Sequence, residues 1–396
     1  MHFQQIEKVP GDPIFGLQEL YKNDPASSKM ELALGVYKDE HGNTPVLDVV
    51  KRAEQHLLEH ETSKSYIGSH GDPLFNQLIT RLVLGDNNPL LDQRAAATQA
   101  PGGTGALRLA AEFIATCLPG RSIWISDPSW PIHQTLFAAA GVEVKHYPYI
   151  DSHNQVAVDT LLDTLNRATK GDVVLLHACC HNPSGFDLTD HDWQRVLDVI
   201  KSRDLLPLLD FAYQGFGDGL EQDASVVRLF AEQLPELLIT HSCSKNFGLY
   251  RERTGALLVC AANSDHLQAI RSQLAVAARN LWSTPPSHGA AVVTHILGND
   301  ELRRQWTQEL ETMRQRIVRL RHGLVEALGS YGLAERFEHI TRQRGIFSYT
   351  GLSIPQVKRL QEEFSIYMVG RGRANITGIN SAHIDQLATA IAHVCK

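Results

Sequence analysis

The sequence contains little of what marks membrane, secreted or nucleic-acid-binding proteins. No apolar run approaches the roughly 18–20 residues that cross a bilayer, and the first residues lack the basic and then apolar segments of a secretory signal. The 37 lysines and arginines are outnumbered by 44 aspartates and glutamates, and the net charge of −7 argues against nucleic acid as the main partner. We therefore expect a cytoplasmic protein with no membrane or nucleic-acid partner.

Cysteine is also scarce. The six cysteines form no C-x-x-C pair, and four of them lie in or beside apolar, strand-like stretches, which favours buried thiols over disulfides. The segment HACCH, residues 177–181, has the composition of a metal site. In a strand, however, successive side chains point to opposite faces and cannot converge on one ion. We expect no metal.

What the sequence does contain is ample material for a core, with 43% hydrophobic and 20% charged residues. Short apolar runs alternate with longer amphipathic segments, and several runs are apolar on both faces, as in a sheet covered by helices on both sides. This pattern predicts an α/β fold with a mostly parallel sheet. The predicted strands are 122–128, 142–149, 172–180, 205–211, 236–244 and 254–261, and the predicted helices include 104–118 and 188–203.

The pattern changes after about Ser287. A long helical span with a break at 298–300 is followed by a shorter α+β stretch, in which RGIFSYTGL predicts a strand and SIPQVKRLQEEF a helix. We predict a large domain at 45–312 and a smaller α+β domain made of 13–44 and 313–396, with an N-terminal arm at 1–12.

Lys245 lies in the segment SCSKNFGLYRERTG, just after an apolar run. A lone lysine is usually a surface charge, but other segments supply matching chemistry. Gly102, Gly103 and Gly105 stand where a strand gives way to a helix, and backbone amides at a helix N-terminus bind phosphate. By itself this signal is weak, because it matches neither the P-loop nor the dinucleotide-binding motif.

Asp210 ends an apolar strand, where open α/β sheets place ligand-binding groups. A buried carboxylate requires a partner, and a cationic ring nitrogen is one. Tyr213 and Asn182 add a phenol and an amide near strand ends. Together with the glycines and Lys245, these groups describe a site for pyridoxal phosphate held covalently by the lysine.

The chain resembles the fold type I pyridoxal-phosphate aminotransferases, specifically the aspartate/aromatic amino acid aminotransferase family. The resemblance extends over essentially the whole chain. It is carried, in the family's order, by GVYKDE, PGGTGALR, DPSWPIH, CCHNPSG, DFAYQGF, SKNFGLYRER, STPP and GRAN.

This resemblance implies roles around the cofactor. Lys245 would hold pyridoxal phosphate and later move a proton, and Asp210, supported by His133, would keep the ring nitrogen protonated. Tyr213 and Asn182 would hydrogen-bond the ring oxygen, and Trp130 would cover the ring. The implied phosphate ligands are Gly103, Thr104, Ser242, Arg253 and, from the neighbouring subunit, Tyr66.

The resemblance also implies two arginines for the substrate. Arg373 would bind the α-carboxylate, with help from Asn182 and the Gly35 backbone. Arg279 would reach across a dimer interface to a side-chain carboxylate. Because Tyr66 and Arg279 would act across subunits, a homodimer is implied. Arg371 occupies a position that is usually small in the family, and its role is left open.

Two departures bear on the substrate. Ile132 and Thr284 stand where the family often has asparagine, and Phe15, Phe347 and Trp282 would add apolar wall. With the resemblance to bacterial aromatic aminotransferases, these departures favour tyrosine and phenylalanine as donors, with aspartate as a further substrate.

The expected reaction moves the amino group to 2-oxoglutarate, gives a 2-oxo acid and glutamate, and proceeds by a ping-pong cycle through pyridoxamine phosphate. Strict aspartate aminotransferase remains the alternative. A pyridoxal-phosphate lyase or decarboxylase is a remote alternative, since it would not need Arg279 for a second carboxylate. A non-catalytic regulator would be expected to lack Lys245 or to carry a DNA-binding segment. This sequence has Lys245 and shows no such segment.

Overall fold

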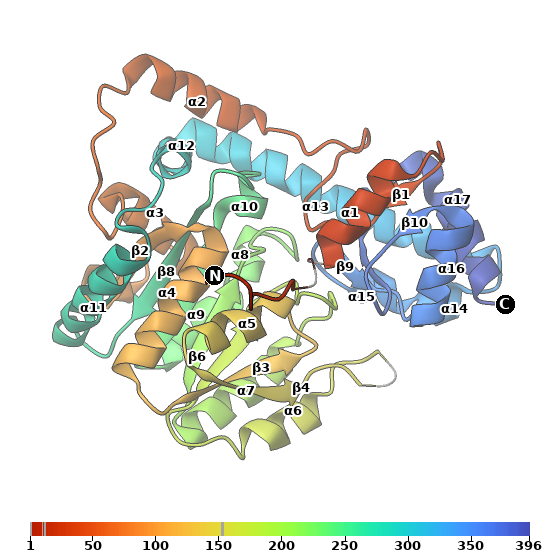
Figure 1. The fold of residues 1–396 in the computed structure, drawn as a ribbon. Helices are drawn as coiled ribbons and strands as arrows, with labels where there is room; N and C mark the ends of the chain where they lie inside the picture. The colour runs from red at the N-terminus through yellow and green to blue at the C-terminus, as the bar shows by residue number, and fades with distance from the viewer. Residues whose placement is uncertain (1, 10, 12, 152–153) are drawn as a thin grey trace. The chain divides into compact units, whose positions relative to one another are not determined.

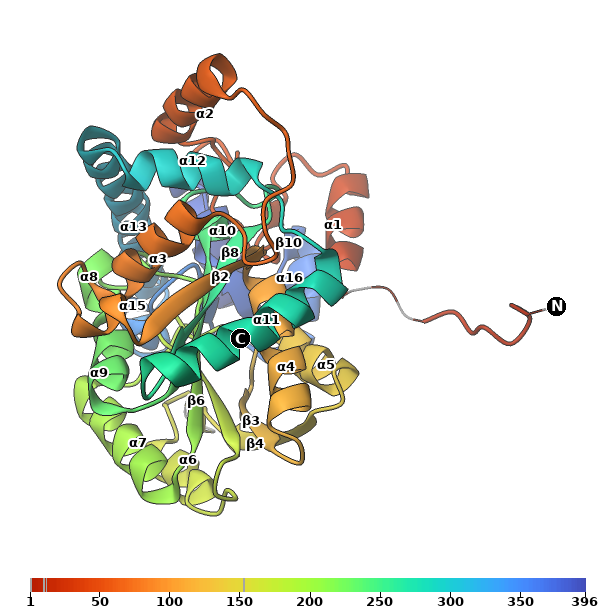
Figure 2. The ribbon, with the colours of Figure 1, turned by 90° about the vertical axis from the view of Figure 1, so that its left-hand side faces the viewer.

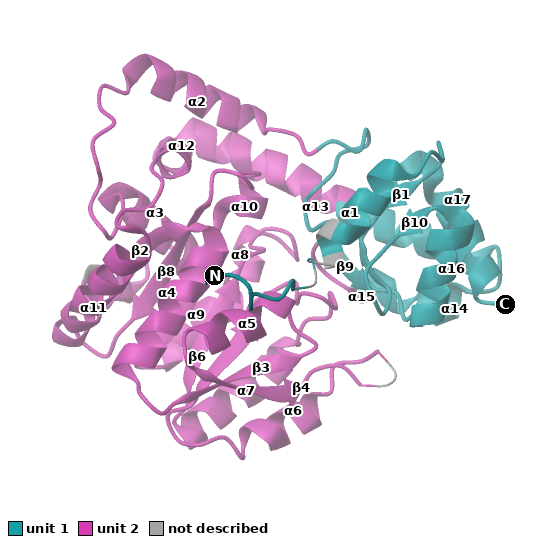
Figure 3. Cartoon of the chain, in the orientation of Figure 1, with its two compact units in different colours: residues 1–43, 317–342, 346–396 teal, residues 44–316, 343–345 magenta. Residues whose placement is uncertain are grey.

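The computed structural model describes residues 2–9, 11, 13–151 and 154–396 (Figure 1). The chain forms two compact units (Figure 3). The first consists of 1–43, 317–342 and 346–396, and the second of 44–316 and 343–345. The division into a large domain at 45–312, a small domain at 13–44 and 313–396, and an arm at 1–12 remains our proposal.

The second unit is built on a seven-stranded sheet. Neighbouring strands are parallel except that the strand at 254–260 pairs antiparallel with both of its neighbours, at 237–242 and 95–101. The predicted mostly parallel sheet is therefore confirmed. In spatial order the strands are β2 (Ala95–Pro101), β8 (Thr254–Cys260), β7 (Leu237–Ser242), β6 (Leu206–Phe211), β5 (Val173–His177), β3 (Ser122–Asp127) and β4 (Glu143–Pro148).

Helices cover both faces of this sheet, with α4 (Gly102–Cys117) and α5 (Pro131–Ala139) on one side and α7 (Asp190–Arg203) and α9 (Ser225–Gln233) on the other (Figure 2). Helix α4 shows why they dock. Its residues Leu107, Ala110 and Ile114 recur at helical spacing and are fully buried. Burying a Leu or Ile side chain stabilises the fold by about 1.5–3 kcal/mol.

The remaining elements of the second unit include α2 (Asp48–His60), α3 (Pro73–Leu84), η1 (Pro89–Asp92), α6 (Val158–Leu165), α8 (Leu220–Asp223), α10 (Cys243–Asn246), α11 (Ser264–Trp282) and α12 (His288–Leu297). The predicted break after α12 is confirmed, because α13 (Asp300–Gly329) begins a new helix. Asn299 accounts for this start, since its Oδ1 accepts the N–H groups of Glu301 and Leu302.

The first unit has short strands between helices. Strand β1 (Met30–Glu31) pairs parallel with β10 (Ile366–Tyr367), and β9 (Phe347–Tyr349) pairs antiparallel with β11 (Arg373–Asn375). The α+β expectation for this part is confirmed, including the helix predicted from SIPQVKRLQEEF. The other elements are α1 (Pro13–Asn23), α14 (Ala334–Phe337), α15 (His339–Arg342), α16 (Ile354–Phe364), η2 (Ile376–Gly378), η3 (Ser381–His383) and α17 (Ile384–Val394).

Two further expectations concern cysteines and membranes. The six cysteines are not joined in disulfides, and four of them are buried, as predicted. Within the described part of the chain, every helix is too short or too polar to cross a bilayer.

Candidate active site

The polar groups of the second unit gather where its parallel strands end. His177 of β5, Asp210 of β6 and Thr240 of β7 lie side by side in register. The strands leading to them are apolar, so the polar side chains appear only at the carboxyl edge of the sheet, where α/β proteins bind ligands. The chain then turns from β7 directly into α10, which carries Lys245.

Asp210 is 8% exposed and is held by two side chains. His133 Nε2 donates to its Oδ2 at 3.1 Å, and Thr240 Oγ1 donates to its Oδ1 at 3.2 Å. Burial by itself raises the pKa of this carboxyl, but the hydrogen bond and charge of His133, with smaller contributions from His177 and Lys245, outweigh it and lower the pKa below its ordinary value. Asp210 is therefore an anion at neutral pH.

A chain of hydrogen bonds leads away from Asp210. His133 Nδ1 lies 2.8 Å from Ser129 Oγ, and that oxygen lies 3.2 Å from His177 Nε2. The backbone N–H of Asn182 donates to His177 Nδ1 at 3.4 Å. Burial, reinforced by His133, lowers the pKa of His177 to about 3, so this ring is neutral. If each group donates to the next one, from the Asn182 N–H through His177, Ser129 and His133 to Asp210, every hydrogen bond in this chain has one donor and one acceptor. This arrangement places a proton on the His133 nitrogen that faces the carboxylate.

Lys245 is half-buried, and its Nζ lies 4.5 Å from the centroid of the Tyr213 ring. Burial lowers the pKa of Lys245 to about 8; Asp210 acts in the opposite direction, and Arg253 adds to the lowering. A substantial fraction of the amine is therefore neutral near physiological pH. Only the neutral amine is a nucleophile.

The glycines at the start of α4 lie against Arg253 and Ser242. A Cβ on Gly102 would be 2.7 Å from Arg253 Nη2, and one on Gly103 would be 3.1 Å from Ser242 Cβ. Arg253 itself has a φ of 52°, and its Nη1 donates to Tyr250 O at 3.1 Å. Bare amides at a helix N-terminus, a hydroxyl and a guanidinium therefore meet in one place. This combination of donors suits a phosphate.

Other predicted residues flank this group. Trp130 precedes α5, and its ring stands at 87° to His133 with centroids 5.3 Å apart. Asn182 is buried, and its Oδ1 has no hydrogen-bond partner among the described residues. Tyr213 is buried directly after β6, and Thr104 is exposed in the first turn of α4. The structure thus brings together the predicted cofactor residues of the second unit other than Tyr66.

Tyr66 and Arg279 lie at the surface of the second unit. The side chain of Tyr66 is 93% exposed, and Arg279 is exposed near the end of α11. Ile132 and Trp282 are partly buried and pack against the hydrophobic core of this unit. The proposed roles of Tyr66 and Arg279 in a neighbouring subunit stay predictions.

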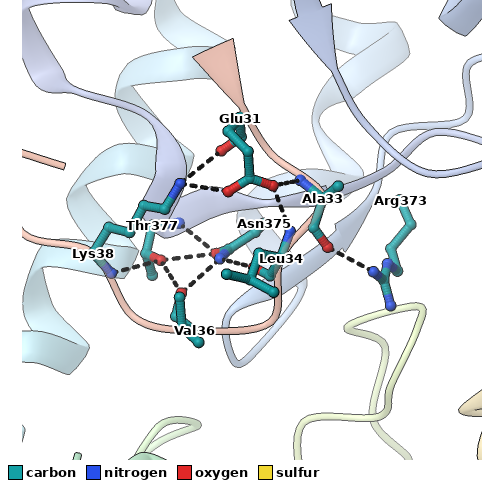
Figure 4. A network of polar contacts seen from close by, with 8 residues as sticks. All are labelled: Glu31, Ala33, Leu34, Val36, Lys38, Arg373, Asn375 and Thr377. Atoms are coloured by element: carbon teal, nitrogen blue, oxygen red, sulfur yellow. Dashed lines mark hydrogen bonds and ion pairs between the residues drawn. The ribbon is translucent and has the colours of Figure 1, made fainter. Parts of the chain in front are cut away.

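The substrate residues predicted in the first unit form a second group, of which Figure 4 shows Arg373 with Ala33. Arg373 Nη2 donates to Ala33 O at 2.7 Å, and its Cζ lies 4.4 Å from the centroid of the Phe347 ring. A Cβ on Gly35 would be 2.9 Å from Cζ of the same ring. The Phe347 ring therefore contacts both Arg373 and Gly35. Arg371 is exposed, and the side chain of Phe15 lies outside the described residues.

The segment HACCH differs from its prediction. Strand β5 ends at His177, and Cys180 has a left-handed φ of 53°. Sulfur atoms of Cys179 and Cys180 and a carboxylate oxygen of Asp223 lie within 4.8 Å of one another. The premise that these residues continue a strand was therefore wrong. Asp223 already accepts backbone N–H groups from Gly215, Gly217 and Asp218, and the absence of a metal remains a prediction.

Three residues at the sheet edge were not singled out from the sequence. Ser129 and His177 extend the hydrogen-bond chain behind His133, and Thr240 supports Asp210 from the neighbouring strand. Two signals were available. Ser129 stands one turn before His133 in DPSWPIH, and His177 ends a strand next to the one that carries Asp210.

Comparison with known proteins agrees with this geometry. Residues 27–391 match the family described as "Aminotransferase class I and II". The aromatic-amino-acid aminotransferase of Pseudomonas aeruginosa is 62% identical over 395 residues, covering 100% of this chain and 99% of the relative, and the aspartate aminotransferase of Escherichia coli K12 is 48% identical over 394 residues, covering 99% and 100%.

Solved structures extend the likeness to three dimensions. The aromatic-amino-acid aminotransferase from Burkholderia pseudomallei, in a crystal structure covalently bound to pyridoxal phosphate, superposes with a TM-score of 0.98 at 44% identity, covering 100% of this chain and 99% of that one. Cytoplasmic aspartate aminotransferase from Saccharomyces cerevisiae gives a TM-score of 0.96 at 34% identity, covering 99% and 98%. The chain belongs to the class I and II aminotransferase family.

Proposed function

We propose that this chain is a pyridoxal-phosphate-dependent aminotransferase that moves the amino group of tyrosine, phenylalanine and also aspartate to 2-oxoglutarate. The observation that carries the proposal is the pairing of two opposed groups at one sheet edge. Lys245 has a pKa lowered to about 8, and Asp210 is kept ionised by His133. A nucleophilic amine beside a buried, persistent carboxylate is what attachment and activation of a cationic ring require.

The residues present fit pyridoxal phosphate. Cβ atoms on Gly102 or Gly103 would press against Arg253 and Ser242, so the two glycines let these phosphate-binding side chains lie close to the bare amides of the helix N-terminus. The orphaned Oδ1 of Asn182 is a buried polar atom that a bound polar ligand would satisfy. Asp210 supplies a fixed negative charge for a ring cation, which offsets the cost of burying that carboxylate.

Each residue then has a separate task. The cofactor, when bound, supplies an electron-accepting ring that stabilises negative charge at the α-carbon of the amino acid. Asp210 would keep that ring cationic, and the hydrogen-bond chain through His133 and Ser129 holds the carboxylate in place. Lys245 forms the covalent link at rest. The amine of Lys245, when it is not bound to the cofactor, would be the base that moves the α-proton. Arg373 binds the α-carboxylate as a bidentate partner.

The substrate assignment is supported by the relatives and by two positions. Ile132 and Thr284 lack the amide groups expected near a pocket that prefers aspartate. Relatives named for aromatic amino acids include one from Paracoccus denitrificans, 44% identical, and one named tyrosine aminotransferase from Rhizobium meliloti, 45% identical. The 48% identical aspartate aminotransferase from Escherichia coli supports aspartate as a further substrate.

We also propose a cytoplasmic homodimer with shared sites. Tyr66 and Arg279 are exposed, as residues that act in a neighbour's site would be in an isolated chain. Free thiols fit a reducing compartment.

The test is a stopped-flow absorbance scan of the cofactor-loaded protein with L-tyrosine and then with L-aspartate. Conversion of the cofactor band to the pyridoxamine phosphate band by tyrosine, at least as efficiently as by aspartate, is the expected result. Conversion by aspartate alone would establish a strict aspartate aminotransferase. Loss of carbon dioxide or of a side chain instead of formation of a 2-oxo acid would indicate a decarboxylase or lyase.

A further inference from the structure

One buried side chain in the first unit connects strand β11 to the loop at 32–38. Asn375 is fully buried, and its backbone N–H donates to Leu32 O at 2.7 Å. Its side-chain Nδ2 donates to Leu34 O at 2.6 Å and to Val36 O at 2.7 Å (Figure 4). These two carbonyls stand on either side of Gly35, so a single amide group brackets the glycine.

The orientation of this amide is fixed. Asn375 Oδ1 accepts the N–H of Thr377 at 2.9 Å and lies 2.8 Å from the Thr377 hydroxyl. That hydroxyl oxygen also lies 3.1 Å from Val36 O and accepts Lys38 N–H at 3.1 Å. Both N–H bonds and the oxygen of the amide are thereby used. An oxygen in place of Nδ2 would face two carbonyl oxygens.

A charged group fixes the same loop from its other side. Glu31 is buried, and its Oε1 accepts the N–H groups of Ala33 at 2.7 Å and Leu34 at 2.6 Å. Its other oxygen, Oε2, pairs with the ammonium of Lys38. The loop that carries Gly35 is thus held at several points by polar groups inside the unit.

The held loop contacts the guanidinium of Arg373. Ala33 O accepts from Arg373 Nη2, and the Phe347 ring lies against both Arg373 and Gly35. A displacement of the loop would therefore move the carbonyl to which Arg373 is bound. Arg373 and Asn375 also belong to the same short strand, β11, so the arginine is tied to the loop through both its side chain and its backbone.

We propose that Asn375 is a positioning residue for recognition of the α-carboxylate: its amide fixes the backbone around Gly35 relative to Arg373, so that both meet the carboxylate in one geometry. This inference rests on the proposed function, because it takes Arg373 as the α-carboxylate ligand. Asn375 has no part in the chemistry at Lys245 under this proposal. Loss of the Asn375 amide would weaken the reaction with a substrate only by weakening recognition of its α-carboxylate.

The test compares Asn375→Asp with Asn380→Asp in the cofactor-loaded enzyme. Asn380 is a matched control in the same unit, because its Oδ1 likewise accepts a backbone N–H at the start of a 3-10 helix, and its Nδ2 donates to Glu40 O, outside the 32–38 loop. The half-reaction is followed with L-tyrosine and with tyramine, the same amine without the carboxylate. Thermal unfolding and the pH titration of the cofactor absorbance are recorded for each variant.

For Asn375→Asp we expect the second-order rate constant with tyrosine to fall about tenfold or more, the cost of losing one or two buried hydrogen bonds. We expect the rate with tyramine and the absorbance titration to match those of the control. Equal losses with tyrosine and tyramine, or no loss with tyrosine, would overturn the proposal.

If Asn375→Asp does not fold, the proposal is tested with Thr377→Val, since this variant keeps the side-chain shape and removes only the hydroxyl that contacts Asn375 and Val36. A fall of about threefold with tyrosine and none with tyramine is expected. No selective fall would count against the proposal. Failure of the proposed function looks different, because the unmodified enzyme would then convert neither tyrosine nor aspartate.

Discussion

The sheet edge of the second unit and the Arg373 group of the first unit bind polar groups by different means. At the sheet edge the polar atoms are titratable side chains whose pKa values are shifted, as for Lys245, Asp210 and His177. Around Arg373 the polar atoms are mainly backbone carbonyls: Ala33 O accepts from Arg373, and the loop that carries it is held by the neutral amide of Asn375 and by the Glu31–Lys38 ion pair. At the sheet edge burial changes the proton affinity of the side chains. Around Arg373 the buried hydrogen bonds fix the conformation of the loop.

This difference separates chemistry from recognition. A group that moves protons must have a pKa near the working pH, and burial beside other charges provides that. A group that only binds a carboxylate needs a constant charge and a constant position, which Arg373 and a pinned loop provide. Changes at the sheet edge should therefore alter the cofactor spectrum and kcat, whereas changes around Arg373 should alter affinity.

The largest effect is expected from Lys245→Ala. This variant lacks the amine that holds the cofactor and moves the proton, and its half-reaction with tyrosine should slow by about 10⁴-fold, the upper range for acid–base catalysis. Single-turnover absorbance measures the loss. Lys201→Ala is the matched control, because Lys201 is an exposed lysine bonded to Gln233. Full turnover by Lys245→Ala would disprove the assignment of the site.

Asp210→Asn should be the next most severe change. It preserves shape and removes the charge that keeps the ring cationic, so kcat should fall by about 10²–10³-fold, as for removal of one key electrostatic group. The absorbance titration of the bound cofactor should shift as well. A variant with normal kcat and an unchanged titration would show that Asp210 is a packing residue.

The reaction of the apoenzyme with pyridoxal phosphate should depend on pH through Lys245. Its pKa is lowered to about 8, and the protonated amine is unreactive, so the rate of covalent attachment should fall about tenfold for each pH unit below 8 and level off above it. Asp210, whose pKa lies below its ordinary value, stays charged throughout this range. A midpoint near the ordinary lysine value would contradict the proposed effect of burial.

Gly35→Ala tests the other side of the comparison and should have the smallest effect. The new Cβ would lie 2.9 Å from Cζ of Phe347, and the ring under Arg373 must shift to accommodate it. Overpacking of this kind costs about 1–3 kcal/mol, so KM for tyrosine should rise about tenfold with kcat nearly unchanged. If Gly35→Ala also changed the cofactor spectrum, the residues around Arg373 would affect the chemistry at the sheet edge, and the distinction between the two groups would be wrong.

Much of the fold was predictable because it depends on local pattern. The fully apolar strands, the helix after the glycines and the break at Asn299 are each specified by residues within one or two turns of one another. The exception is instructive. The apolar run predicted a strand over 172–180, but the backbone leaves β5 at His177 and takes a left-handed turn at Cys180.

The sequence by itself determined which chemical groups are present: a lysine after an apolar strand, a carboxylate at a strand end, glycines before a helix and arginines in recognisable segments. Only the tertiary structure decided how they act. Asp210 meets His133 across 77 positions of sequence, and Arg373 meets Ala33 across 340. Hydrogen bonds and desolvation depend on distances between such remote residues. The pKa of Lys245, the proton on His133 and the bracketing of Gly35 by Asn375 therefore arise only in the folded chain.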